Sequence, residues 1–483
     1  MKCFNLPPHV GNIRSHALLR ALTVASAVSC CLAADVIDVG SRRELFVDGH
    51  LVDRQRDVAL QLHSPVPREV VIEFDEPWEG NISGYATVFH DGDRFRMYYR
   101  ANHFNLANQK QSPEKVCYAV SVDGIHWTKP ELGLFDHEGS KANNIVWQGS
   151  GGHNFTPFKD TNPDCAPDAR YKALASAGNG LVPFVSPDGF HWTKTRDEPF
   201  ITDGMFDSQN LAFYDNVRGQ YVAFFRDFKD GIRDIKVCTS EDFLTWTKGR
   251  WLDYGDAPAE HLYTNAIVPY VRAPHLFVGF PKRFVPERKV DFHPISGVSD
   301  GVFMSSRDGL HWRRWREAFI RPGPMPERWV NRNNMTAWGV LVTRSDQEGA
   351  PDELSVYSSE GYYQQRGRLR RYTLRLDGFV SMHATPTGGE FVTKPLRFDG
   401  DRLELNYATS AVGSIRIELQ DADGKPLSGF SLEDCDEIWG DHVDRTVHWK
   451  GKTALGQWRG HPVRLRFVME DADLFAIRFT SDK

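Results

Sequence analysis

A repeated turn sequence constrains the fold of this chain more than any other feature. The heptapeptide Ser-x-Asp-Gly-x-His-Trp occurs three times, and a related copy without the Gly and the His lies before the last of them. The four copies are residues 121–127 (SVDGIHW), 186–192 (SPDGFHW), 240–246 (SEDFLTW) and 306–312 (SRDGLHW), and a degraded fifth copy (LDGF) is residues 376–379. Repeats at this spacing indicate one supersecondary unit for each copy.

Each copy predicts a β-hairpin. Asp-Gly is the preferred two-residue turn sequence, because Gly adopts a positive φ without steric cost. The residues before the turn alternate as in a strand, and the Trp after it offers a large apolar face. Two more strand-like runs precede the hairpin, for example residues 85–90 and 95–100 in the first unit and 211–214 and 221–226 in the third. Four strands in each of five units predict a five-bladed β-propeller.

The pattern changes beyond residue 386, where strict alternation of apolar and polar residues begins. It appears at residues 403–406, 415–419, 463–467 and 475–479. We therefore expect a β-sandwich over residues 387–483, after a propeller over residues 35–386. Residues 35–75 are expected to add a strand or two that close the ring. No long run has the 3.6-residue apolar period of a helix, so the predicted class is all-β.

The first 34 residues have the composition of a secretory signal peptide. They contain three basic residues and no acidic one, and the apolar run 21–33 is too short to cross a bilayer. We expect cleavage after Ala33 or Ala34 and a secreted or periplasmic protein without a transmembrane segment. Lipoprotein anchoring at a cysteine of this run is the alternative.

Charge and motif content exclude several functional classes. The chain has 58 Lys and Arg against 64 Asp and Glu, a formal charge of −6, so no basic footprint for nucleic acid is expected. The cysteines after the signal segment are far apart, which argues against a disulfide framework and against cysteine-ligated zinc. They are Cys117, Cys165, Cys238 and Cys435.

Cofactor motifs are also missing from the sequence. There is no P-loop, dinucleotide fingerprint or H-E-x-x-H motif, so no cofactor is expected. A calcium ion on the propeller axis is the one option left open, without a recognisable ligand set. Residues 297–301 (GVSDG) match the nucleophile elbow of serine hydrolases, but they precede a predicted strand and not the helix that the motif requires.

The predicted propeller, its Ser-x-Asp-Gly-x-x-Trp turns and the sandwich that follows resemble the glycoside hydrolase superfamily of levansucrases, invertases and arabinanases. Four further strings resemble exported, largely uncharacterised bacterial proteins similar to that superfamily. They are residues 77–80 (PWEG), 206–210 (FDSQN), 262–265 (LYTN) and 369–373 (LRRYT). The resemblance implies a carbohydrate substrate at the mouth of the central channel and acidic residues at the starts of the innermost strands.

Glycosidic cleavage uses one carboxylic acid to protonate the leaving oxygen and a second carboxylate as nucleophile or base. Three acids lie just before predicted inner strands, namely Glu79 in unit one, Asp207 in unit three and Glu260 in unit four. Unit two has His153 at this place and unit five has Arg332. We expect Glu260 to be the general acid and Asp207 the base, nucleophile or transition-state stabiliser, with Glu79 as a third candidate.

Polar residues near these acids are candidate substrate contacts. They are His153, Asn210, Arg226, His261, Tyr263, Asn265, Lys282, Arg283 and Glu360. The two asparagines have an equally good structural explanation, because such amides can tie neighbouring blades together. Arg366, Arg368 and Arg370 alternate along one strand, which predicts either a solvated face or recognition of carboxylate or sulfate on an anionic polysaccharide.

The sequence therefore predicts an exported glycoside hydrolase acting on a polysaccharide or oligosaccharide. The alternative is a non-catalytic propeller that binds glycan or protein and has lost part of the catalytic set, which the missing acid in unit two favours. Clustering of Glu79, Asp207 and Glu260 at one channel mouth would favour the enzyme. A sialidase is disfavoured, because its turns have one more residue between Asp and Gly and its fold has six blades.

Overall fold

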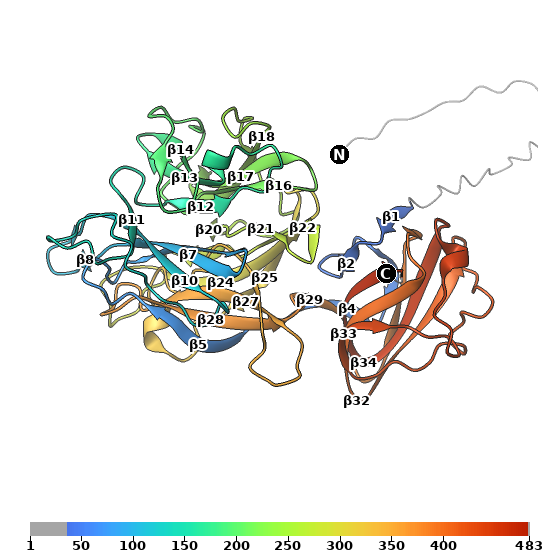
Figure 1. Cartoon of the computed structure of the whole chain (residues 1–483). Coiled ribbons are helices and arrows are strands. Elements are labelled where there is room, and N and C mark those ends of the chain that lie inside the picture. Colours follow the sequence, from blue (N-terminus) through green and yellow to red (C-terminus); the bar gives the residue numbers. More distant parts are fainter. Residues whose placement is uncertain (1–35, 482–483) are drawn as a thin grey trace, which may run out of the picture. The chain divides into compact units, whose positions relative to one another are not determined.

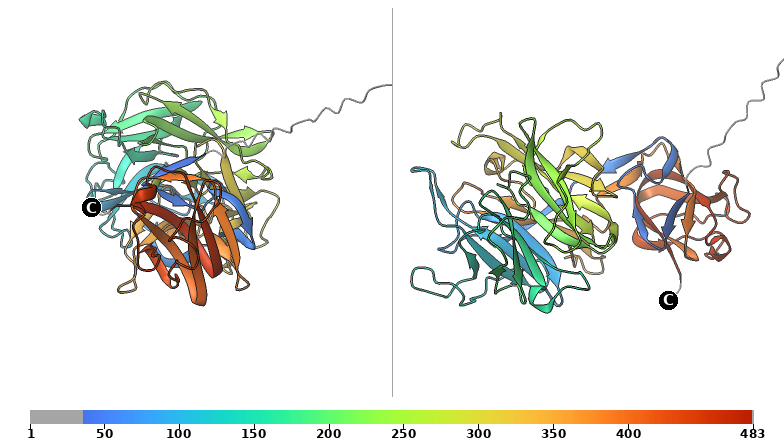
Figure 2. Two further views of the ribbon diagram at one scale, coloured as in Figure 1. Left: turned by 90° about the vertical axis from the view of Figure 1, so that its right-hand side faces the viewer. Right: turned by 90° about the horizontal axis from the view of Figure 1, so that it is seen from above.

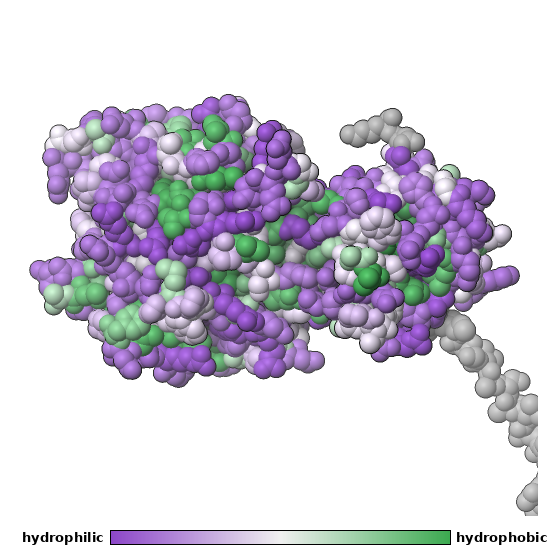
Figure 3. Space-filling view, turned by 90° about the horizontal axis from the view of Figure 1, so that it is seen from below, coloured by the Kyte–Doolittle hydropathy of each residue, from purple (hydrophilic) through white to green (hydrophobic). Residues whose placement is uncertain are grey.

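The computed structural model describes residues 36–481, and nearly all regular structure in this span is β-strand. Its only helices are three short 3₁₀ turns, Pro167–Ala169, Pro326–Trp329 and Gly456–Trp458. The all-β class is therefore confirmed. The predicted signal peptide lies outside the described residues. Within them, no helix is long and apolar enough to cross a membrane, and the face in Figure 3 is mostly hydrophilic with smaller hydrophobic areas.

Five separate sheets form the blades of a propeller (Figure 1). Blade one contains β6 (Gly84–Asp91), β7 (Arg94–Ala101), β10 (Lys115–Ser121) and β11 (Ile145–Gln148). Blade two contains β12 (Thr156–Lys159), β13 (Tyr171–Ala177), β14 (Gly180–Ser186) and β15 (Thr193–Lys194). Blade three contains β16 (Leu211–Asp215), β17 (Gln220–Lys229), β18 (Ile232–Ser240) and β19 (Arg250–Trp251).

Blades four and five are less regular. Blade four has six strands, β20 (His261–Leu262), β21 (Val268–Tyr270), β22 (Ala273–Gly279), β23 (Lys282–Val285), β24 (Val298–Ser306) and β25 (Trp312–Ile320). Blade five has β26 (Leu341–Thr343), β27 (Glu353–Glu360), β28 (Arg368–Arg375) and β5 (Val66–Glu73). A small hairpin, β8 (Phe104–Asn105) and β9 (Lys110–Gln111), leaves blade one.

The first strands of neighbouring blades lie beside one another around the axis. β12 contacts both β6 and β16, and β26 contacts β6. Thr87 of β6 also forms a parallel bridge with Trp338, just before β26. The five-bladed propeller is thus confirmed, and the first strands of blades one, two, three and five lie side by side around its axis.

The turn of the repeat is longer than predicted. Val120 bridges Thr128, so residues 121–127 form a seven-residue loop, and the prediction of a two-residue hairpin turn is wrong. Side-chain oxygens explain the difference, because they accept the backbone N–H groups that a short hairpin would pair across strands. Ser121 Oγ accepts the N–H of Gly124 at 2.9 Å, and Asp123 Oδ1 accepts those of the next two residues.

The tryptophan of each repeat is fixed by the same loop. Trp312 Nε1 donates to the carbonyl oxygen of Gly309 at 3.0 Å, and the other three copies repeat this bond. The Trp312 ring lies 6.1 Å from the Phe224 ring and 6.4 Å from the Phe277 ring, measured between centroids. Since Phe224 belongs to blade three and Trp312 to blade four, the repeated tryptophan joins neighbouring blades.

The N-terminal segment divides between the two parts of the fold. Of residues 35–75, which were expected to close the ring, β5 pairs with β28 as the outermost strand of blade five. The strands before it pair instead with the C-terminal sheet (Figure 2). They are β1 (Ile37–Gly40), β2 (Arg43–Leu45), β3 (Val52–Arg56) and β4 (Val58–Leu62).

The C-terminal strands form the predicted β-sandwich together with β1 to β4, around one apolar core. They are β29 (Val380–Ala384), β30 (Gly389–Thr393), β31 (Leu396–Phe398), β32 (Arg402–Asp421), β33 (Asp441–Thr446) and β34 (Val463–Thr480). The alternating runs predicted as separate strands lie pairwise within β32 and β34. Phe46 from the N-terminal segment packs against Phe391 in this core, so both ends of the chain contribute to it.

Replacing Trp312 by Ala tests the role of the repeated tryptophan. We expect the free energy of unfolding to fall by about 3–5 kcal/mol, because a buried aromatic contact between two blades is lost. Denaturant titration followed by circular dichroism measures the change. Trp439→Ala is the control, since Trp439 is 64% exposed and its loss should change stability by less than about 0.5 kcal/mol. Equal effects of the two substitutions would contradict this role.

Candidate functional site

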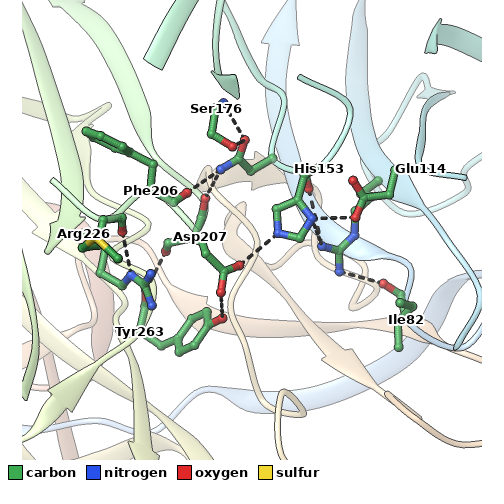
Figure 4. A network of polar contacts seen from close by, with 12 residues as sticks. Ile82, Glu114, His153, Ser176, Phe206, Asp207, Arg226 and Tyr263 are labelled. Atoms are coloured by element: carbon green, nitrogen blue, oxygen red, sulfur yellow. Dashed lines mark hydrogen bonds and ion pairs between the residues drawn. The ribbon is translucent and has the colours of Figure 1, made fainter. Parts of the chain in front are cut away.

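Three titratable side chains from the segments before β10, β12 and β16 form a chain of hydrogen bonds (Figure 4). Asp207 precedes β16, His153 precedes β12 and Glu114 precedes β10. His153 Nε2 lies 3.0 Å from Asp207 Oδ1, and His153 Nδ1 lies 2.5 Å from Glu114 Oε1. The imidazole therefore bridges two carboxylates that come from different blades.

This arrangement fixes the charge of each member. Burial alone would lower the pKa of His153, but its bonds to Asp207 and Glu114 outweigh burial and raise that pKa. Burial likewise opposes ionisation of Asp207, but the bond to His153 and the positive charge of Arg332 hold its pKa well below the usual range. The Asp207 side chain is 59% exposed. Asp207 is thus an ionised carboxylate that solvent, and hence a ligand, can reach.

Tyr263 connects Asp207 to a group of cations. Its hydroxyl donates to Asp207 Oδ2 at 3.2 Å and accepts from Arg332 Nη2 at 3.2 Å. Four cationic groups surround its ring, with centroid distances of 4.0 Å for Lys282 Nζ and 5.2, 5.4 and 5.6 Å for the guanidinium carbons of Arg226, Arg233 and Arg332.

A fifth cation, Arg100, lies on the other side of His153. It donates to the His153 carbonyl oxygen at 3.4 Å and to the Tyr362 hydroxyl at 2.5 Å. The same hydroxyl accepts from Arg332 at 3.2 Å. Arg100 also stacks over Tyr85, at 4.6 Å from the ring centroid. Arg100 and Arg332 are thus linked through one phenol. We call Arg100, Arg226, Arg233, Lys282 and Arg332 the cation group.

The backbone around these residues is strained. Tyr85, Ala266, Arg332 and Asn334 adopt φ values of +51°, +44°, +68° and +61°, in the left-handed region that side chains other than glycine seldom occupy. Such conformations cost about 1–3 kcal/mol each and concentrate where a structure holds functional side chains in place. Strain of this kind motivates a functional hypothesis for this region.

Glu260, the expected general acid, lies in a different set of contacts. It binds Arg283 Nη1 at 3.2 Å and also forms an ion pair with Arg314. Together with Tyr254 and Asp234 it lines a cavity of about 350 Å³. Within residues 36–481, no hydrogen bond or ion pair joins Glu260 to Asp207.

Glu79, the third candidate acid, is buried within blade one. It accepts hydrogen bonds from the Tyr99 hydroxyl at 2.5 Å and from Lys129 at 2.7 Å. Burial raises its pKa in spite of the charge of Lys129. The described residues contain no bond between Glu79 and Asp207, so hydrogen bonds and ion pairs do not connect the three expected acids into one cluster.

The arginines expected to recognise an anionic polysaccharide are paired with carboxylates. Glu360, itself a candidate channel residue, is 1% exposed and binds Arg370 at 2.8 Å, Arg368 at 3.3 Å and Arg328 at 3.4 Å. Arg366 lies 3.7 Å from a carboxylate oxygen of Glu73. These guanidinium groups already have counterions, so they have less charge to offer a ligand.

Of the other residues predicted to contact substrate, some lie beside the site and others make structural contacts. His261 lies beside the site, where its Nδ1 accepts the Arg233 N–H at 3.0 Å, and Arg283 binds Asp300 at 2.7 Å. Asn210 and Asn265 are 1% exposed and donate to backbone carbonyl oxygens, but within the described residues Asn210 donates only to its own segment, as at Phe206 O, so the predicted link between blades is seen for Asn265 alone of the two. Asn265 reaches across to Phe224 O of blade three.

Several residues of the site were not predicted, namely Tyr85, Arg100, Glu114, Arg233 and Tyr362. One of them had a visible signal. Arg100 follows two tyrosines at the end of its strand, just as Arg226 follows two phenylalanines, so alignment of the blades would have paired them. Glu114 lies in the connection between β9 and β10, where no repeat marks it.

Other motifs carry no chemistry in the described part of the chain. Ser299 of the GVSDG sequence lies in strand β24 and donates to the Asn333 carbonyl oxygen at 2.8 Å, so it is no nucleophile elbow. All four cysteines of residues 36–481 are free thiols. In this span no group of three or more His, Cys, Asp or Glu could hold a metal ion.

No family model matches the sequence, and no curated protein matches it either. Solved structures of similar shape include a protein described as a glycoside hydrolase, with 13% identity and a TM-score of 0.44 over 65% of this chain and 92% of that one. An N-acetylgalactosamine deacetylase from F. plautii has 14% identity and a TM-score of 0.43 over 65% and 95%. The Bombyx mori GH32 β-fructofuranosidase BmSUC1 has 9% identity and a TM-score of 0.41 over 88% and 95%.

These neighbours include glycoside hydrolases and also an enzyme of another activity. At such identities and TM-scores they assign no activity to this chain. The five-bladed ring rests on the strand pairing of this structure itself.

The charge of His153 is open to direct measurement. We expect NMR titration to give His153 a pKa above 6.5, and Asp207→Asn to lower it because one carboxylate partner is lost. Since the folded-state pKa is raised, the network stabilises the protein below pH 6.5 and loses that contribution as pH rises through the folded-state pKa. His153→Gln identifies the resonance, and Asp93→Asn at an exposed site is the control. A pKa that Asp207→Asn leaves unchanged would contradict the pairing.

Proposed function

We propose that the chain is an exported carbohydrate-active enzyme that cleaves glycosidic bonds at the channel mouth. The observation that carries this proposal is Asp207, an exposed and ionised carboxylate held by His153 and Tyr263 among strained backbone. Structural neighbours that include glycoside hydrolases are compatible with it. Export is a further part of the proposal and depends on the signal-like composition of residues 1–34.

In this mechanism Asp207 acts as the base that activates water or as the nucleophile at the anomeric carbon. Its low pKa keeps it ionised near neutral pH, as either role requires. The second group must deliver a proton to the leaving oxygen. His153 is the nearest group with a raised pKa, so we assign it this role, with its bond to Asp207 exchanged for one to the glycosidic oxygen. Glu114 then orients the imidazole through Nδ1.

A specific observation also favours the non-catalytic alternative, in which the propeller only binds glycan or protein. Glu79 and Glu260, the other two expected acids, are engaged with Lys129 and with two arginines. An ancestral acid set that had lost its function would leave acids in such structural roles. Measurement of turnover separates the two candidates.

Asp207→Asn tests the enzyme directly. We expect the variant to fold normally and to lose at least about a hundredfold in turnover, since a general base or nucleophile contributes that much or more. The assay follows new reducing ends released from a panel of polysaccharides. Asp93→Asn, at an exposed turn, is the control and should keep full activity.

Unchanged turnover in Asp207→Asn would remove this residue from the mechanism. Products with the ultraviolet absorbance of an unsaturated sugar would identify elimination and contradict hydrolysis.

His153→Gln and Glu260→Gln together identify the proton donor. If His153 supplies the proton, its replacement lowers turnover at least about a hundredfold, whereas Glu260→Gln keeps most of the activity. A second readout compares turnover of two substrates, one with a good leaving group and the natural glycan. Loss of the acid lowers turnover of the first substrate less, because its leaving group needs no proton. A selective loss in Glu260→Gln would instead restore Glu260 as the acid.

A further inference from the structure

The cation group has an unusual charge balance. Four guanidinium groups and one ammonium group lie around Tyr263, Tyr362 and His153, and within residues 36–481 none of the five forms an ion pair with a carboxylate. Their hydrogen bonds go to neutral acceptors instead. Arg226 Nε donates to Met205 O at 2.9 Å, and the Nε atoms of Arg100 and Arg233 are buried without any partner.

Lys282 is the most deeply buried member of this group. It is 0% exposed, and the hydrogen bond of its ammonium group is a long one, 3.4 Å, to Asn331 Oδ1. Burial lowers its pKa well below the usual value, and the charges of Arg332 and Arg233 lower it further. Burial and the charge of Arg226 also lower the pKa of Arg233. The members of the group therefore repel one another, and no carboxylate of residues 36–481 forms an ion pair with any of them.

Among the other buried Lys and Arg side chains of residues 36–481, all but Lys115 form ion pairs with carboxylates. Glu360 binds three arginines within blade five, and Arg371 binds both Glu69 and Glu353. Two carboxylates act on the cation group without forming an ion pair, Asp207 on Arg332 and Glu114 on Arg100, and both are already bonded to His153. Buried charges are normally paired, so this unpaired positive charge points to a missing anion.

We propose that the cation group binds the carboxylate or sulfate of an acidic sugar, next to Asp207. Arg332 and Arg226 lie on Tyr263 together with the half-exposed Arg233, so their guanidinium groups can hold an oxyanion with charge-assisted bonds. Tyr263 then lies between the anion and the catalytic carboxylate. This inference rests on the proposed function, because it places the acidic group on the sugar that Asp207 attacks. The cation group, and not Arg366, Arg368 and Arg370, is then the site that recognises an anionic substrate.

The test measures binding to the full chain by isothermal titration calorimetry. The probes are polygalacturonate, alginate, carrageenan and fucoidan, each beside its carboxyl-reduced or desulfated form. We expect at least one acidic polysaccharide to bind and its neutralised form to bind at least about tenfold more weakly. The carboxylated and the sulfated pairs distinguish the two sources of the anion.

Variants locate the anion on the protein. We expect Arg332→Gln to weaken binding of the acidic form at least about tenfold and to leave binding of the neutral form unchanged. Arg233→Gln is expected to do the same and replaces Arg332→Gln if that variant fails to fold. Arg313→Gln is the matched control, because Arg313 also lacks a carboxylate partner but lies exposed on β25, over Trp315. The control should bind as the unaltered protein does.

Three results would overturn the inference. The first is that no acidic polysaccharide binds. The second is that the acidic and neutralised forms bind with equal affinity. The third is that Arg332→Gln and Arg313→Gln lose the same affinity for the acidic form. Competition by inorganic sulfate as effective as that by the polysaccharide would also do so, because the group would then be a simple anion site.

Failure of this inference can be told from failure of the proposed function. If the protein cleaves a neutral glycan and the cleavage depends on Asp207, the proposal of an acidic substrate is wrong and the proposed glycosidase activity is supported. If an acidic glycan binds through Arg332 but is not cleaved, the anion site is supported and the proposed glycosidase activity is contradicted.

Discussion

Closure of the ring is the constraint on which the site depends. β5, from the N-terminal part of the chain, completes blade five by pairing with β28, so five inner strands are held around one axis. The loops that enter these strands then bring His153, Asp207 and Arg332 together from distant parts of the sequence, and Glu114 joins them from the connection between β9 and β10. The position of each follows from the ring.

The fold could be predicted from the sequence because its signals are local and repeated. The Asp and Trp of each turn make the same hydrogen bonds in every full copy, including the third, where Phe243 takes the positive φ that Gly has elsewhere. The length of the turn was missed, because bonds from side-chain oxygens to backbone N–H groups are invisible to strand periodicity. The pairing of β1 to β4 with the C-terminal sheet was missed because short strands carry no mark of their partner.

The site was only partly predictable, for a physical reason. Position before an inner strand points to Asp207, His153 and Arg332, which the structure joins through hydrogen bonds, but this position does not predict the direction of each side chain. Glu79 and Glu260 occupy equivalent positions and bind Lys129 and Arg314 instead. Contacts in three dimensions decide the difference, because Glu79 and Glu260 are held in ion pairs whereas Asp207 stays exposed beside His153.

The most direct test of this account is a crystal structure of the full chain, as the Asp207→Asn variant, with a bound acidic oligosaccharide. The account predicts a sugar ring within hydrogen-bond distance of residue 207 and of His153, with its carboxylate or sulfate on Arg332 beside Tyr263. An oligosaccharide bound in the cavity at Glu260, or one whose acidic group points away from the cation group, would contradict it.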